Sequence, residues 1–200
     1  MDAHTGFFRC APFFDLICSD LFAILPLLVI YMNRNNLEIE RKFLIRRPPL
    51  SELLSMGESS EIEQTYLVPD KEGVRARVRK RGRDGVYTYT HTEKSFITDL
   101  TRIEIERTIG RDEYEELLKK ADPERQTIKK TRFVLPYEGQ VFELDLFPFW
   151  EKQAYLEIEL ESEDQKIVFP PMLDIVREIT YDARYTNSAL AKSIPAEEIP

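Results

Sequence analysis

The sequence predicts a mainly β fold of the α+β type: an eight-stranded antiparallel β-barrel tunnel with helices at its periphery. The main observation is that apolar and charged residues alternate with period two from residue 36 onward, which is typical of strands. Turn-forming residues separate the alternating segments. Hydrophobic residues make up 42% of the 200-residue chain, which is enough for a packed core.

Eight segments are expected to be strands, and they span residues 37–45, 61–68, 73–80, 86–94, 101–109, 127–135, 140–146 and 155–161. Turns are predicted at residues 82–85 and 136–139, where glycine and acidic residues follow one another. Helices are expected at residues 50–56, which Pro49 precedes and Gly57 ends, and at residues 111–121. Two shorter helices are expected at residues 171–176 and 187–191.

Residues 1–35 differ in composition from the rest, so the folded domain is expected to span residues 36–200. The apolar run at residues 21–32 is short for a membrane span, which needs about 20 apolar residues. Extending it back to residue 13 brings in Asp15 and Asp20, which a bilayer core disfavours. Membrane anchoring through residues 13–32 is therefore the weaker alternative to a dispensable extension, with Met32 as the natural initiator.

Charge and cysteine content exclude several classes of protein. A net charge of −8 and a pI near 5.0 argue against a protein that coats nucleic acid with its surface. The cysteines, Cys10 and Cys18, both lie in the N-terminal extension and form no zinc-binding pair. The rest of the chain has no thiol, which suits a reducing compartment and predicts a cytoplasmic protein.

Charged residues recur on one side of six predicted strands. Alternate residues of a strand share a face, so Glu38, Glu40 and Lys42 point the same way. For one strand, a solvated face is the simpler explanation, but the recurrence over six strands favours a common interior. If the apolar faces turn outward under the helices, the barrel is lined with acids (Glu38, Glu40, Glu104, Glu106, Glu143, Asp145, Glu157, Glu159) and bases (Lys42, Arg75, Arg77, Arg79, Lys94, Lys130, Arg132).

Such an interior is suited to a polyanion together with a metal ion. Pairing all of these ions with one another in a dry core would cost much desolvation energy. Arginine and lysine side chains bind phosphate oxygens, and clustered carboxylates bind hard divalent cations such as Mg²⁺ or Mn²⁺. The chain has no P-loop motif, so side chains would have to hold the phosphates.

At these residues the sequence resembles the CYTH superfamily, also called triphosphate tunnel metalloenzymes. The E-x-E-x-K motif that defines this family matches Glu38, Glu40 and Lys42. The later motifs follow in order: R-x-R at Arg77 and Arg79, a lysine at Lys94, E-x-E at Glu104 and Glu106, K-x-R at Lys130 and Arg132, E-x-D at Glu143 and Asp145, and E-x-E at Glu157 and Glu159. The closing segment, residues 182–191, looks like the end of the compact bacterial-type inorganic triphosphatases.

Two features depart from the family pattern. Arg75 gives its strand a third alternating arginine, and we take Arg77 and Arg79 as the pair that matches the family. Ala183 stands where relatives often carry a lysine, so the contact of that lysine is not expected in this chain.

The resemblance implies metal-dependent hydrolysis of a phosphoanhydride bond, with inorganic tripolyphosphate as the expected substrate. The implied phosphate ligands are Lys42, Arg75, Arg77, Arg79, Lys94, Lys130 and Arg132. The implied metal ligands are Glu38, Glu40, Glu157 and Glu159 for a first Mg²⁺ or Mn²⁺, and Asp145 with Glu104 and Glu106 near a second. Lys42, Lys94, Lys130 and Glu159 are the implied catalytic residues.

Other activities of the same family remain open at this stage. One is an adenylate cyclase of the class IV type, and another is a thiamine or nucleoside triphosphatase, for which Phe147, Phe149 and Trp150 offer aromatic rings. A non-catalytic sensor of polyphosphate or nucleotide is an alternative of another class. The only expected partner is a small-molecule triphosphate, bound by a monomer or by a homodimer.

Overall fold

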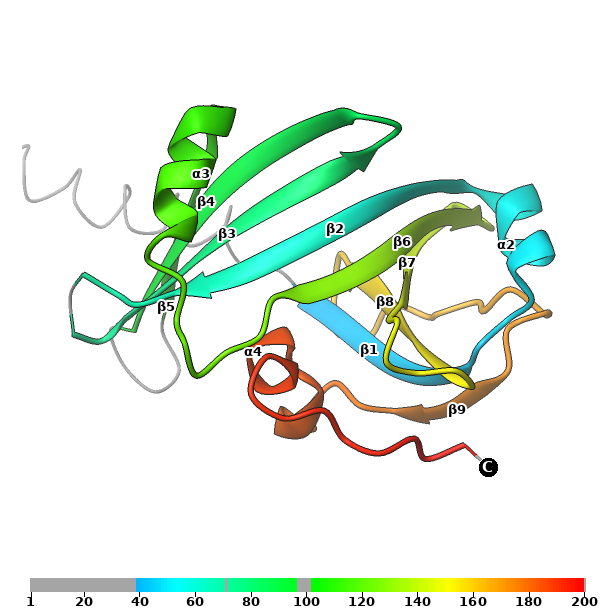
Figure 1. The fold of residues 1–200 in the computed structure, drawn as a ribbon. Coiled ribbons are helices and arrows are strands. Elements are labelled where there is room, and N and C mark those ends of the chain that lie inside the picture. The colour runs from blue at the N-terminus through cyan, green and yellow to red at the C-terminus, as the bar shows by residue number, and fades with distance from the viewer. Residues whose placement is uncertain (1–38, 71, 97–101, 200) are drawn as a thin grey trace, which may run out of the picture. The chain divides into compact units, whose positions relative to one another are not determined.

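The computed structural model describes residues 39–199, apart from residue 71 and residues 97–101 (Figure 1). The expectations for the N-terminal extension and for Glu38 fall outside these described residues. Within the described part, no helix combines the length and the apolar character that crossing a membrane requires.

The described chain is built around one antiparallel sheet. Its strands are β1 (Ile39–Arg46), β2 (Glu58–Leu67), β3 (Val74–Arg83), β4 (Val86–Phe96), β5 (Arg102–Ile109), β6 (Ile128–Tyr137), β7 (Gln140–Leu146), β8 (Gln153–Leu160) and β9 (Ile175–Glu178). The strand order across the sheet is β5-β4-β3-β2-β6-β7-β8-β1-β9. The mainly β, antiparallel class is as predicted, and all eight expected strands are present.

The sheet differs from the prediction in two ways. It has nine strands, because residues 175–178, part of an expected helix at 171–176, form β9. The prediction of that helix is wrong: β9 pairs with β1, with Phe43 opposite Glu178, so these backbone groups bond to a distant strand. The barrel is also not closed, since β5 and β9 are the two edges and no ladder joins them in the described ranges.

Tight turns fix the registers of two hairpins. Asp84 and Gly85, between β3 and β4, have φ values of 55° and 85°, and Glu138 and Gly139, between β6 and β7, have 48° and 74°. Two successive positive φ values are typical of the type I′ turn that joins twisted antiparallel strands. Both turns lie where the sequence predicts them.

Apolar clusters and helices cover the outer face of the sheet. Helix α2 (Leu50–Met56) buries Leu53 against residues of β1, β6, β7 and β8, among them Phe43 and Phe133. Helix α3 (Arg111–Leu118), three residues shorter than predicted at its end, buries Tyr114 against Val78 of β3 and other residues of β2 and β5. Figure 1 shows α3 beside β3 and β4, and α2 beyond the ends of β2 and β6.

The inner face is curved enough for strands that are not neighbours to touch. Arg132 on β6 reaches over β7 and donates from Nη2 to Oε2 of Glu157 on β8 at 2.6 Å. Arg132 also donates from Nε and Nη2 to the two carboxylate oxygens of Asp145 at 2.7 and 2.6 Å. The charged faces of these strands therefore point into a common interior, as predicted.

A third apolar cluster closes one end of this interior. It joins inward-facing residues of the sheet, such as Leu44, Tyr66 and Tyr155, to residues of the C-terminal segment, such as Tyr185 and Leu190. This segment contains the 3₁₀ helix η1 (Ala183–Tyr185) and helix α4 (Asn187–Leu190), the latter close to the predicted residues 187–191. We call this cluster the floor, and we call the opposite end, toward Glu40 and Glu159, the entrance.

Arginine and carboxylate side chains tie the C-terminal segment down. Arg177 donates two hydrogen bonds of 2.8 Å to Glu198, and Tyr185 donates its hydroxyl proton to the same carboxylate. The hydrogen bond from Arg177, followed by that from Tyr185, lowers the pKa of Glu198 to about 2. The carboxyl group of Glu198 is therefore ionised in the folded protein at neutral pH.

Because Arg132 neutralises carboxylates in the interior, Arg132→Met should destabilise the fold by about 3–5 kcal/mol, the usual cost of leaving a buried charge unpaired. Urea unfolding at pH 7 measures this free energy. The double variant Arg132→Met/Asp145→Asn should lose less than the sum of the single variants. Additive losses would show that the contact does not stabilise the curved sheet.

Glu198 should contribute to acid stability. Its folded pKa lies below the ordinary value of 4.5, so its stabilising effect is complete above that pH and declines as pH falls toward about 2. Glu198→Gln should therefore lower Tm at pH 7 and reduce the dependence of Tm on pH below 4.5. Thermal unfolding at a series of pH values checks this, with exposed Glu163→Gln as the control. Parallel Tm–pH curves for the wild type and Glu198→Gln would contradict it.

Candidate active site

The predicted site residues whose side chains the structure describes share one face, because their strands pair in a matching register. Lys42 on β1 lies opposite Glu157 on β8, and Arg132 on β6 lies opposite Asp145 on β7. In the other half of the strand order, Thr92 on β4 lies opposite both Arg77 on β3 and Glu106 on β5. Directly opposed residues of antiparallel strands project to the same side, so this face carries the ionic residues of both halves.

Four strands, β1, β6, β7 and β8, form what we call the first wall. Its ion pairs are continuous: Lys42 contacts Glu157 at 2.7 Å, Glu157 contacts Arg132, and Arg132 contacts Asp145. Lys130 completes the chain by pairing with Asp145. The side chain of Asp145 is fully buried and that of Lys130 is 4% exposed, so these charges depend on one another rather than on water.

The pKa values of the first wall follow from burial and pairing. Burial opposes ionisation of Asp145, but Lys130 and Arg132 outweigh it and hold its pKa below the ordinary range. Burial lowers the pKa of Lys130, and Asp145 only partly opposes the effect. For Lys42, burial works against the charged form, yet the carboxylates of Glu157 and Glu40 raise its pKa. Lys42 therefore keeps its positive charge.

Strands β3, β4 and β5 form the second wall. Glu106 accepts hydrogen bonds from Arg79 at 3.1 Å and from the Thr92 hydroxyl at 2.7 Å, and it lies 4.0 Å from Arg77. Strand β2 separates the two walls and turns buried Gln64 and Tyr66 inward, with Gln64 donating to the Tyr66 hydroxyl at 3.0 Å. The predicted site residues whose side chains the structure describes thus form two ionic groups on one face of the sheet, one on each side of β2.

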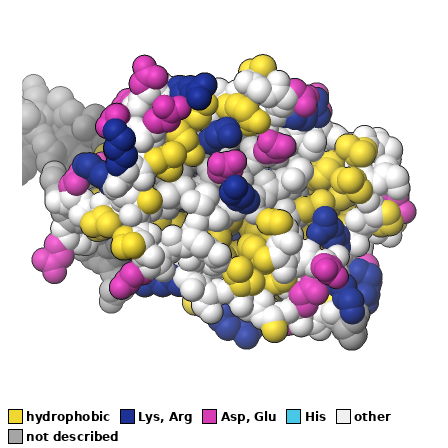
Figure 2. All heavy atoms as spheres, viewed as in Figure 1, with side chains coloured by type: hydrophobic (Ala, Val, Ile, Leu, Met, Phe, Trp, Pro, Cys, Tyr) yellow, Lys and Arg dark blue, Asp and Glu magenta, His cyan; other side chains and the backbone are white. Residues whose placement is uncertain are grey.

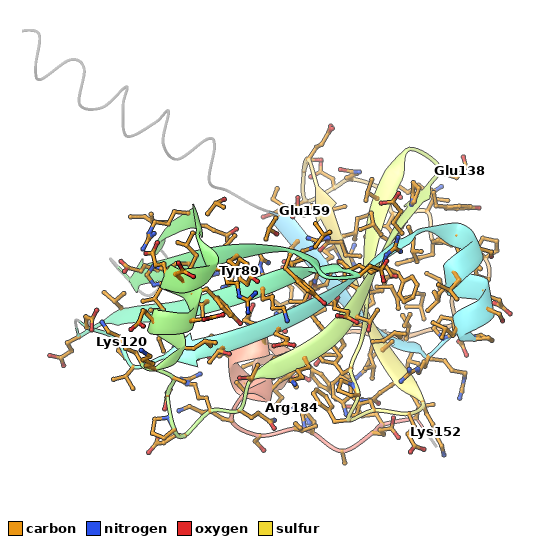
Figure 3. The ribbon with its side chains drawn as sticks, turned by 45° about the horizontal axis from the view of Figure 1, so that its top comes forward. Tyr89, Lys120, Glu138, Lys152, Glu159 and Arg184 are labelled. Atoms are coloured by element: carbon orange, nitrogen blue, oxygen red, sulfur yellow. The ribbon has the colours of Figure 1, made fainter. Side chains whose placement is uncertain are left out.

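A cavity of about 320 Å³ opens at the entrance of the first wall. Carboxylates of Glu40, Glu143, Glu157 and Glu159 line it, from β1, β7 and β8. Figure 3 shows Glu159 in the upper part of the view and Arg184, which belongs to the C-terminal segment, in the lower part. The entrance is therefore acidic on this side.

The chemistry of this donor set fits Mg²⁺ or Mn²⁺, since both prefer carboxylate oxygens. Burial and the neighbouring charge of Glu157 raise the pKa of Glu40, an unfavourable state that a divalent cation relieves. As the side chains stand, the described residues contain no group of three carboxylates close enough to hold a metal, because Glu157 faces Lys42 and Arg132 instead. Asp145 is likewise held by Lys130 and Arg132, and Glu106 lies on the second wall.

The remaining predicted residues occupy the ends of the second wall. Arg75 is exposed and lies opposite Lys94 in the β3–β4 ladder, whereas Arg77 and Arg79 are half-buried. Arg77 and Arg79 are therefore less accessible to solvent than Arg75. Lys94 is half-buried and lies opposite Glu104, whose side chain, like residue 38, falls outside the described part.

Some neutral and basic residues of the site were not predicted. Tyr155 is buried on the inner face opposite Asp145, and no protein group bonds to its hydroxyl in the described residues. Tyr66, Gln64 and Arg81 also face inward, as their ladder partners show. A charge-alternation signal cannot find the neutral residues, although their positions two or four residues from the ionic ones would place them on the same face.

The aromatic residues considered for thiamine recognition belong to the floor. Phe147 and Trp150 are fully buried, with ring centroids 5.4 Å apart in an edge-to-face arrangement. Phe149 stacks on Phe147 at 5.1 Å, and the indole nitrogen of Trp150 donates to the carbonyl of Pro195. The rings of Phe147 and Trp150 are used in packing and are not available for stacking on a ligand, whereas Phe149 is only partly buried.

Charged side chains interleave with hydrophobic ones on the face that Figure 2 shows, rather than forming one large patch of a single sign. The grouped ionic residues of the described chain lie instead on the inner face, where the strand registers place them.

Comparison with known proteins agrees with this geometry. Residues 36–183 match the model of the CYTH domain family. A protein of Nitrosomonas europaea named inorganic triphosphatase is 37% identical over 79% of this chain and 99% of its own length. One of Acetivibrio thermocellus with the same name is 33% identical over 78% of this chain and 94% of its own.

A solved structure described as an inorganic triphosphatase superposes with a TM-score of 0.55 and 33% identity, covering 80% of this chain and 97% of that one. The family match, the two relatives and the shared fold lead to one conclusion: the chain belongs to the CYTH domain family.

Proposed function

We propose that this protein hydrolyses inorganic triphosphate to pyrophosphate and phosphate, with Mg²⁺ or Mn²⁺ as cofactor. The observation that carries the proposal is the inner face on which both walls gather phosphate-binding cations beside carboxylates. Relatives of similar length that bear the name inorganic triphosphatase support this choice of substrate.

The reaction exchanges one phosphorus–oxygen bond for another. A water oxygen attacks the terminal phosphorus atom, the bond to the bridging oxygen breaks, and the electron pair stays on the pyrophosphate that leaves. The proton of the water passes to a carboxylate of the site or to solvent. Protein cations assist because they stabilise the charge that moves to the leaving group.

The cations of the two walls are assigned to the substrate. Lys42, Lys130 and Arg132 would bind phosphate oxygens from the first wall, and Arg75, Arg77, Arg79 and Lys94 would do so from the second. In the structure the cations of the first wall pair with Glu157 and Asp145, so substrate oxygens must take over some of these contacts. Lys42 is positively charged and so suited to bind a phosphate oxygen, because Glu157 and Glu40 raise its pKa.

The carboxylates at the entrance are assigned to the metal. Glu40, Glu157 and Glu159, together with Glu38, would hold Mg²⁺ or Mn²⁺, while Asp145, Glu104 and Glu106 would lie near a second ion. When bound, such a cation neutralises phosphate oxygens and acidifies water. Glu159, exposed at the entrance, and the cations Lys42, Lys94 and Lys130 are the proposed catalytic residues.

We propose that the catalytic domain spans residues 36–200 and that residues 1–35 are not part of it. The family match, which begins at residue 36, supports this boundary. A cytoplasmic location is proposed from the absence of cysteine after residue 35.

The substrate is tested by phosphate release from tripolyphosphate, ATP and thiamine triphosphate, each with Mg²⁺, Mn²⁺ or Ca²⁺. Tripolyphosphate with Mg²⁺ or Mn²⁺ should give the highest kcat/KM, and EDTA should abolish release. Formation of cyclic AMP from ATP would point to a cyclase instead. Tight binding of tripolyphosphate without turnover of any substrate would show that the protein is a sensor.

The two kinds of site residue should affect different kinetic constants. Lys42→Ala should raise KM for tripolyphosphate about tenfold, because a charged hydrogen bond to substrate is lost. Glu159→Ala should lower kcat by about 10–100-fold, because a proposed metal ligand is removed. Steady-state kinetics measure both constants.

The control for Lys42 is Arg41→Ala, since Arg41 is the adjacent residue on the other face of β1 and pairs with Glu178. It should leave kcat and KM close to those of the wild type. Normal kinetics for both Lys42→Ala and Glu159→Ala would remove these residues from the site.

A further inference from the structure

Arg81 extends the arginine row of β3 beyond the residues that match the family motif. It lies two residues after Arg79 on the same strand, so its side chain is on the same inner face. Its ladder partners are Thr88 on β4 and Ile62 on β2, and Ile62 in turn lies opposite Lys130 on β6. From Arg77 to Arg81 the row runs away from the floor and toward the entrance.

The guanidinium of Arg81 is held in place by a neutral group. Its Nε donates to the hydroxyl of Ser60 at 3.1 Å, and Ser60 lies opposite Arg132 in the β2–β6 ladder. Arg81 is therefore anchored to the residue of β2, Ser60, that lies opposite Arg132 of the first wall.

Within the described part of the chain, Arg81 differs from its neighbours in pairing with no carboxylate. Arg79 contacts Glu106 at 3.1 Å, and Arg83 contacts Asp84 at 3.1 Å. Among the residues that the structure describes, no acidic group lies within ion-pair distance of Arg81, although the side chain is half-buried. Its four remaining N–H donors are thus available to an anion.

The surrounding charges favour an anion at this point. Burial lowers the pKa of Arg79, and although Glu106 opposes this, the like charges of Arg77, Arg132 and Arg81 lower it further. These arginines therefore repel one another around Arg79. A bound phosphate would relieve this repulsion and satisfy the free donors of Arg81.

We propose that Arg81, oriented by Ser60, forms a phosphate subsite at the entrance of the tunnel. It binds the outermost phosphate of inorganic triphosphate, opposite the acidic cavity lined by Glu40, Glu143 and Glu159. The subsite rests on the proposed function, since it names an additional contact to the same substrate. Its role is in capture and positioning, because none of the metal-site carboxylates whose side chains the structure describes pairs with Arg81.

The test compares Arg81→Ala, Arg81→Lys and Ser60→Ala with the control Arg83→Ala. Arg83 is the next residue of the row, but it pairs with Asp84 and its side chain is 56% exposed. Isothermal titration calorimetry with tripolyphosphate and no added metal gives Kd, and steady-state hydrolysis gives KM and kcat. Thermal unfolding of the same samples reports on the fold.

Arg81→Ala should raise Kd and KM about tenfold and change kcat by less than about twofold, as expected when one charged contact is lost. Arg81→Lys should recover part of the affinity, because it keeps the charge without the planar fork. Ser60→Ala should raise KM by a smaller factor, and Arg83→Ala should match the wild type.

Two results would overturn the subsite while leaving the proposed function intact. One is that Arg81→Ala binds and hydrolyses tripolyphosphate like Arg83→Ala. The other is that Arg81→Lys is as impaired as Arg81→Ala and both lose Tm and kcat together, as a purely structural role requires. If the wild type neither binds nor hydrolyses tripolyphosphate, the subsite and the proposed function are both wrong.

Discussion

The ion pairs of Arg132 are the interaction on which the rest of the fold depends. A guanidinium in the interior must be matched by carboxylates, and Asp145 and Glu157 reach it from two different strands. That match is possible only when β6, β7 and β8 curve around a common centre. The curvature in turn leaves the opposite faces of these strands convex and apolar, where α2 and the loop before β9 cover them. The charged interior and the apolar outer face of these strands therefore both follow from the pairing of Arg132 with its carboxylates.

Local sequence signals predicted most of the fold. Residues 140–146 and 50–56 have the predicted bounds, because turn residues and the Pro49 and Gly57 signals mark their ends. At Gly57 a Cβ atom would lie 2.0 Å from the carbonyl oxygen of Val134, so the close approach of α2 to β6 requires glycine. Strand β9 was missed because its short sequence becomes a strand only through pairing with β1, about 130 residues away. Whether β5 and β9 pair likewise depends on contacts between segments far apart in the chain, which local sequence signals do not contain.

For the site, alternation predicted which face each charged residue occupies but not which residues pair. The position of a residue along its strand fixes its side, so Lys42, Arg77 and Asp145 could be placed together. The division into two walls, with Glu106 on one and Glu157 on the other, depends on strand order, which the sequence pattern does not contain. Nor does the sequence pattern show which side chains are buried in packing. The rings of Phe147 and Trp150 fill the floor, whereas the alternating arginine row that includes Arg81 continues toward the entrance.

The open edge of the sheet has a mechanical consequence. In the described ranges no backbone hydrogen bonds link β5 to β9, so the distance between the two walls can change without breaking a ladder. The like charge of Arg132 on the first wall lowers the pKa of Arg79 on the second, so an anion between these two arginines would be attracted to both. A polyanion bound there is therefore expected to bring the two walls closer together, while the ladders of β2 with β3 and β6 keep them joined.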